Sequence, residues 1–126
     1  MNRSIYGYLL NGKILFDVAN KKIVYYSFES TDMPISFKVV TLSDTQSRLL
    51  YFLLANRKKE VIDKSEILNY VWDSFNLSSS SQRLWQTMND LKKKLSYVGI
   101  PDTFIQNVYG AGYYIDDSAV SPLYVG

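Results

Sequence analysis

The spacing of the apolar residues changes at Thr41, and this change constrains the fold more than any other feature of the chain. Before it, the runs YGYLL, KILFDV, IVYYSF and ISFKVV are typical of strands in a half-buried sheet. After it, apolar residues recur three or four positions apart, as in helices that pack on one face. The final run, FIQNVYGAGYYI, is strand-like again. This order predicts an α+β domain of leading strands, three helices and a closing hairpin.

Turn signals separate the leading strands from one another. Asn11-Gly12 is the strongest short hairpin signal, and a second turn is expected over residues 19–22. A loop that contains Pro34 precedes the last of these runs. Residues 1–42 are therefore expected to form three or four short antiparallel strands.

Helix-start signals divide the next part of the chain, residues 43–98, into three helices. The segment SDTQ at 43–46 forms a capping box ahead of a first helix over about 44–55. The segment DKSE at 63–66 repeats this pattern ahead of ILNYVW, which predicts a shorter second helix. The serines of DSFNLSSSS are good N-caps for the third helix. That helix is expected to cover about 80–97, because a glycine and a proline follow it.

The third helix carries apolar and polar residues on opposite sides. One side is a narrow apolar stripe, predicted to be buried, formed by Leu84, Met88, Leu91 and Leu95. The other side carries amides and a lysine, at Gln82, Gln86, Asn89 and Lys93. A solvated surface is the ordinary explanation for such a side. The alternative is a DNA-reading surface, since Gln and Asn pair with adenine edges and residues 82–95 carry four basic side chains against one acidic.

Gly110 and Gly112 lie between the two strand-like halves of FIQNVYGAGYYI. Glycines at this spacing can cradle a phosphate, form a tight turn, or let two strands approach closely. A dinucleotide-binding loop needs a helix after its glycines, whereas YYID reads as a strand. We therefore expect the glycines to shape the turn of a hairpin over about 103–116.

The composition lowers the expectation of an enzyme. The chain of 126 residues contains no histidine and no cysteine, which removes the usual general base, the commonest metal ligand and any disulfide. The longest apolar run, LLYFLLA, is far too short to span a membrane. No cofactor is expected. The four serines at 78–81 are interpreted as helix caps, because no catalytic base lies near them in the sequence.

Four segments together resemble the winged-helix DNA-binding domain of OmpR/PhoB-type response regulators, and within that group the ToxR/CadC-like transcription regulators. They are LSDTQSRLLYFLL, EVIDKSEILNYVW, SSSSQRLWQTMNDLKKKL and FIQNVYGAGYYI, within residues 37–116. The resemblance implies a winged helix-turn-helix domain over residues 1–116. Its implied parts are an N-terminal antiparallel sheet over 1–42, three helices over 43–98 and a wing over 103–116. Residues 117–126 are expected to be a linker or tail.

By this resemblance, the third helix enters the major groove and the wing reaches the adjacent minor groove. The positions expected to contact DNA are Lys64, Trp72, Gln82, Arg83, Gln86, Asn89, Asp90, Lys92, Lys93 and Tyr109. The loop expected to contact RNA polymerase contains Ser74, Phe75 and Asn76. Two positions depart from the family pattern, because relatives often carry arginine where this chain has Asp90 and Tyr109.

The function expected from these features is a sequence-specific DNA-binding transcription regulator of bacterial type, acting as an activator. The alternative is a winged-helix module that binds protein, since a fold alone does not fix a function. Double-stranded DNA is the expected partner, with RNA polymerase and a second copy of the chain on DNA as further partners. The expected location is the cytoplasm, either free or as the cytoplasmic domain of a longer inner-membrane protein with a sensor.

Overall fold

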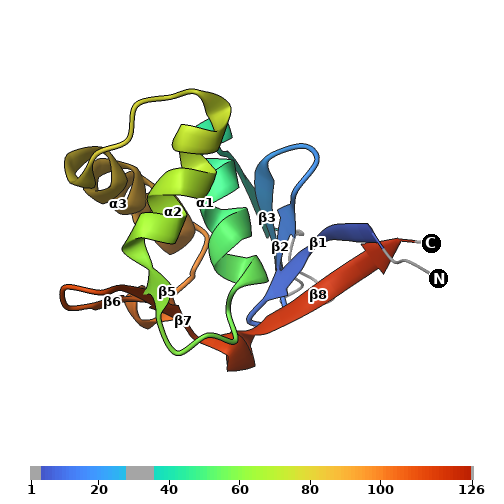
Figure 1. The fold of residues 1–126 in the computed structure, drawn as a ribbon. Coiled ribbons are helices and arrows are strands. Elements are labelled where there is room, and N and C mark those ends of the chain that lie inside the picture. The colour runs from blue at the N-terminus through green and yellow to red at the C-terminus, as the bar shows by residue number, and fades with distance from the viewer. Residues whose placement is uncertain (1–3, 28–35, 126) are drawn as a thin grey trace.

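The computed structural model describes residues 4–27 and 36–125, and Figure 1 shows their arrangement. The strands are β1 Ser4–Leu10, β2 Ile14–Asp17, β3 Lys22–Ser27, β4 Ser36–Thr41, β5 Ile62–Asp63, β6 Ile105–Val108, β7 Gly112–Ile115 and β8 Val120–Val125. The α-helices are α1 Asp44–Ala55, α2 Lys64–Val71 and α3 Ser81–Tyr97. The predicted order of strands, three helices and hairpin is confirmed. In the described part of the chain, no helix is long and apolar enough to cross a membrane.

The leading strands form an antiparallel sheet in the order β4-β3-β2-β1-β8. Its last member comes from the far end of the sequence, and Figure 1 shows β8 lying beside β1. The expectation of a linker or tail is therefore wrong for Val120–Val125, which pairs along the whole length of β1. Pro122 makes this segment a poor strand candidate in the sequence. Because β8 is an edge strand, a residue without a backbone N–H is tolerated there.

A smaller sheet forms the wing, with its strands in the order β5-β7-β6. Strands β6 and β7 are the two halves of the predicted hairpin. The third strand, β5, is not predicted by the sequence, because two residues are too few to show a period. It is defined by long-range pairing, in which Ile62 lies opposite Tyr113 and Asp63 opposite Gly112. This pairing joins the wing to the residue at which α2 begins.

One hydrophobic core joins the large sheet to the helices. From the sheet, Tyr8, Leu10 and Phe16 are fully buried, and α1 contributes Leu49 and Leu53. The predicted burial of the apolar stripe of α3 is confirmed, since none of its four residues is more than 2% exposed, at Leu84, Met88, Leu91 and Leu95. The burial of this stripe fixes the rotation of α3 about its axis, and its opposite side is directed to solvent.

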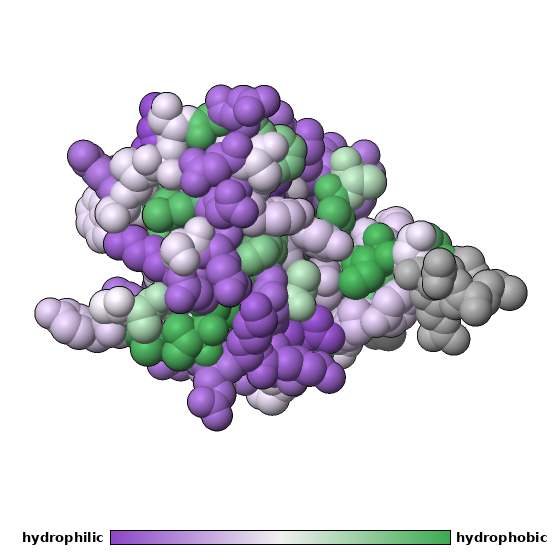
Figure 2. Space-filling view, in the orientation of Figure 1, coloured by the Kyte–Doolittle hydropathy of each residue, from purple (hydrophilic) through white to green (hydrophobic). Residues whose placement is uncertain are grey.

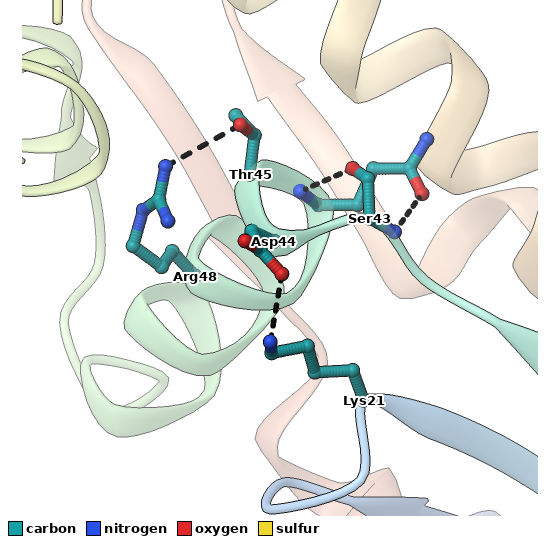
Figure 3. A network of polar contacts seen from close by, with 6 residues as sticks. Lys21, Ser43, Asp44, Thr45 and Arg48 are labelled. Carbon is teal, nitrogen blue, oxygen red and sulfur yellow. Dashed lines mark hydrogen bonds and ion pairs between the residues drawn. The ribbon is translucent and has the colours of Figure 1, made fainter.

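Side-chain hydrogen bonds fix where α1 begins. Ser43 and Gln46 form the predicted capping box, with Ser43 Oγ accepting from the Gln46 N–H at 3.1 Å (Figure 3). Lys21 reaches this helix start from the turn between β2 and β3, and its Nζ lies 2.7 Å from Asp44 Oδ1. The hydrogen bond from Lys21 lowers the pKa of the Asp44 carboxyl, so the carboxylate stays charged beside the positive end of the helix dipole. Figure 3 also shows Arg48 donating to Thr45, at 3.3 Å.

The start of α2 follows the sequence prediction only in part. Asp63 caps the helix as expected, with its Oδ1 accepting from the Ser65 N–H at 2.7 Å. The second half of the capping box is not formed, and the Glu66 carboxylate instead pairs with Lys59 at 3.2 Å. The single cap still places the first residue of α2, Lys64, directly against the wing.

Candidate nucleic-acid interface

The polar side of α3 is a continuous surface directed away from the core. Gln82, Gln86 and Lys93 are exposed and Asn89 is half-buried, as the sequence predicts for this side. We call these four residues the α3 ridge. They come from successive turns of one helix, so they run along its axis as a row. Such a row has the dimensions and the hydrogen-bonding groups needed to follow the floor of a major groove.

Gln86 of the α3 ridge is oriented by Asp90. The Gln86 amide donates from Nε2 to Asp90 Oδ1 at 3.1 Å, one helical turn away. A primary amide has a second N–H and an oxygen, which together are the groups that pair with an adenine edge. Asp90 therefore supplies a fixed orientation for Gln86 in this structure. Direct contact between Asp90 and DNA stays a prediction.

The three consecutive lysines of α3 have three different environments. Lys94 Nζ turns toward α1 and donates to Thr41 O at 2.9 Å and to Gln46 Oε1 at 2.7 Å. Lys92 is half-buried beside the connection between α3 and β6. Lys93 alone of the three lies fully on the α3 ridge. The sequence-based count of four basic charges therefore overstates the positive charge available to a ligand, because Lys94 serves as a link between helices.

A groove of about 480 Å³ separates the amino-terminal half of α3 from the wing. Lys64 lies between these walls, at the start of α2. Gln82 and Trp85 line the helix side, and Tyr109, at the wing tip, lines the other. Figure 2 shows the wing projecting from the body with a hollow above it. Three of the predicted contact residues, Lys64, Gln82 and Tyr109, are therefore brought to one groove.

The two wing glycines have different roles. Gly110 adopts a positive φ of 73° at the turn, as expected of a tight turn. Gly112 lies within strand β7, where a Cβ atom would overlap the carbonyl oxygen of Ile62 in β5. Beside it, the Lys64 N–H donates to Ala111 O at 3.1 Å. Gly110 therefore makes the turn, whereas Gly112 allows close contact of two strands, and the expectation that both shape the turn holds only for the first.

Trp72, a predicted contact to the DNA backbone, belongs to the core instead. Its side chain is only 3% exposed, so we remove it from the proposed contact set. It lies at the end of α2 and lines a second groove between α1 and α3. Arg83 and Asp90 line the same groove. The Arg83 guanidinium donates to Ser78 O at 3.3 Å, which ties this part of α3 to the loop before it.

The loop between α2 and α3 is held by contacts that the sequence did not reveal. Ser74 Oγ donates to Tyr70 O at 2.7 Å, and Asn76 adopts a left-handed conformation with φ of 58°. The guanidinium of Arg48 lies 4.2 Å from the centre of the Phe75 ring, and its Nε donates to the carbonyl of Val71. Phe75 remains 49% exposed. The predicted polymerase loop is therefore an ordered surface that presents an aromatic ring.

Trp85 is the main residue of this region that the predicted contact set leaves out. It is 60% exposed, on the flank of α3 that faces the wing. In the sequence it flanks the polar side of the third helix, about 40° from Asn89 and about 60° from Gln82. The available signal was its place one position after Leu84, which points it out of the core and toward the ridge.

Comparison with known proteins gives a family and a fold. Residues 38–115 match the family described as "Transcriptional regulatory protein, C terminal". The chain is 25% identical over 108 residues to the "Cholera toxin transcriptional activator" of Vibrio cholerae serotype O1. That match covers 86% of this chain and 34% of the relative, so the chain spans about a third of that protein's length.

The solved structures similar to this one include a domain of NsrR and a domain of CadC. The C-terminal domain of the nisin resistance regulator NsrR, a lantibiotic response regulator, is 27% identical, with a TM-score of 0.54. That match covers 71% of this chain and 90% of the NsrR domain. The DNA-binding domain of E. coli CadC is 16% identical, with a TM-score of 0.67, and covers 98% of this chain and 100% of the CadC domain. The CadC likeness supports the fold, including the N-terminal sheet.

Proposed function

This chain belongs to the "Transcriptional regulatory protein, C terminal" family and is a DNA-binding domain of winged-helix fold, and we propose that it reads DNA sequence with α3 in the major groove. The observation that carries the proposal is the α3 ridge, which presents three amides and a lysine on one straight row. The wing would then lie along the adjacent backbone and minor groove. Binding of the domain to specific sequences near promoters would then regulate transcription.

The proposal assigns different tasks to the ridge residues. Lys93 is an exposed cation whose expected partner is a phosphate, and Lys64 beside the wing is expected to act likewise. Phosphate contacts position a protein on DNA without reading its sequence. Gln86 and Asn89 carry amides that can donate to N7 and accept from the N6 amino group of adenine. We therefore propose that the preferred sites contain A·T pairs under the middle of α3.

The first prediction contrasts a phosphate contact with a base contact. Lys93→Ala should weaken binding to every duplex and reduce the slope of log K against log salt concentration by about one. Gln86→Ala should instead lose about 1–3 kcal/mol of discrimination at one or two base pairs and leave non-specific binding unchanged. The measurement is a titration of a duplex selected from random sequences, and of a scrambled duplex, across a series of salt concentrations.

The result for each variant can contradict the contact proposed for its residue, a phosphate contact for Lys93 and a base contact for Gln86. If Lys93→Ala keeps wild-type affinity at every salt concentration, Lys93 is a solvated side chain and contributes no phosphate contact. If Gln86→Ala leaves the preferred sequence unchanged, the ridge is the ordinary solvated side of a surface helix. A wild-type chain that shows no salt-dependent binding to any duplex would favour the protein-binding alternative.

We also propose that the loop between α2 and α3 contacts RNA polymerase. The support is the exposed Phe75 ring, which Arg48 holds in place from the side of α1. Phe75→Ala should leave affinity for the selected duplex unchanged and lower transcription from a promoter that carries this site. Tyr26→Ala is the matched control, because Tyr26 is equally exposed but lies on β3 and lines a different surface pocket from Phe75. Equal loss of DNA affinity and transcription would instead make the loop part of the DNA interface.

A further inference from the structure

The α3 helix leaves one large apolar side chain in solvent beside its reading surface. The four apolar residues of its stripe are buried, whereas Trp85 keeps 60% of its surface exposed. Burial of a tryptophan side chain removes a large apolar area from water, and tryptophan is enriched at interfaces. The exposed ring lies in the groove between α3 and the wing, where the sugar-phosphate backbone of a bound duplex would run.

The position of Trp85 around the helix axis limits what it can touch. At about 100° per residue, Trp85 lies about 40° from Asn89 and about 60° from Gln82. It therefore borders the α3 ridge on the side of the wing, next to two amides that are directed at base edges. A side chain at this border reaches the edge of the major groove, close to the backbone of one strand.

The apolar group that DNA presents at that place is the C5-methyl group of thymine. This methyl is the main apolar feature of the major groove, and side chains recognise it by packing against it. We infer that Trp85 reads thymine by packing its indole ring on this methyl group, at a base pair next to one read by Gln82 or Asn89. This inference rests on the proposed function, because it requires α3 to enter the major groove.

The opposite wall of the groove supports the same assignment. Tyr109 at the wing tip is fully exposed and Lys64 supplies a cation between the walls, so one strand would lie between two aromatic rings and beside a positive charge. Trp85 comes from the helix that reads bases, whereas Tyr109 comes from the wing. Sensitivity to a base methyl group is therefore expected of Trp85, and Tyr109 is expected to pack on the sugar-phosphate wall without distinguishing bases.

The test replaces each thymine of the selected duplex singly by deoxyuridine, which removes only the methyl group. For the wild-type chain, one or two of these replacements should weaken binding about three- to tenfold, the scale expected for burying one methyl group. Trp85→Ala should bind the thymine duplex more weakly and should no longer distinguish it from the deoxyuridine duplex at those positions. Tyr109→Ala is the matched control, and it should keep the full difference between the two duplexes.

The outcomes separate this inference from the proposed function. Specific, salt-dependent binding that is equally tight to thymine and deoxyuridine at every position would overturn the role of Trp85 and leave DNA binding intact. Retention of the methyl effect by Trp85→Ala would assign the methyl contact to another residue and also overturn it. If the wild-type chain binds no duplex, the proposed function itself fails. Because the first comparison uses only the wild-type chain, it does not depend on how a variant folds.

Discussion

Gly112→Ala is expected to open the junction between the wing and α2 and to weaken DNA binding to all sequences. The added Cβ would overlap a backbone carbonyl oxygen, that of Ile62, so no side-chain rotation can relieve the clash. Strand β5 must move away from β7, which breaks the pairing of Asp63 with residue 112. Overpacking of this kind costs about 1–3 kcal/mol or more. Urea unfolding and a duplex titration measure the two effects.

Gly110→Asn is the matched control for this prediction. Gly110 is two residues away, has a positive φ and has open space around the place where a Cβ would lie. Asparagine tolerates the left-handed conformation better than other side chains, so this variant should lose less than about 1 kcal/mol of stability. If Gly112→Ala unfolds at the same urea concentration as the wild type, then β5 and β7 are not in close contact, and the wing is held to the body in another way.

The sequence predicted the elements whose signals are local. The change of spacing at Thr41, the cap at Ser43 and the stripe of α3 each depend on neighbours within a few residues, and all three are confirmed. Strands β5 and β8 were missed because each is defined by a partner far away in the chain. A two-residue strand has no period. Pro122 argued against a strand in the sequence, and only the sheet order shows that β8 lies at an edge, where a proline is tolerated.

For the candidate site, too, the predictions that depend on local spacing hold, and those that depend on distant parts of the chain do not. The outward orientation of Gln86 follows from helical spacing, and the structure agrees with it. The inward turn of Lys94 could not be predicted, because a lysine has a flexible stem and its acceptors at Thr41 and Gln46 come from another part of the chain. Trp72 was placed at the interface by family position alone. Only the packing of α2 against the rest of the core shows that its ring is buried.

Leu91→Ala is expected to lower the free energy of unfolding by about 2–5 kcal/mol, the range measured for large-to-small changes in protein cores. Leu91 is fully buried in the middle of the stripe that fixes the rotation of α3, so the space it leaves cannot be filled by solvent from the surface. A loss of this size is a large part of the stability of a small domain. Thermal and urea unfolding measure it.

Lys93→Ala is the control for Leu91→Ala, because Lys93 lies two residues away on the opposite side of the same helix. Alanine is a good helix former, and an exposed substitution of this kind should change stability by less than about 0.5 kcal/mol. The two variants should therefore separate stability from DNA binding: Leu91→Ala loses stability, and Lys93→Ala loses affinity with its fold intact. If Leu91→Ala does not change the unfolding midpoint, the rotation of α3 differs from that described, and the ridge of Gln82, Gln86, Asn89 and Lys93 cannot be the surface that enters the major groove.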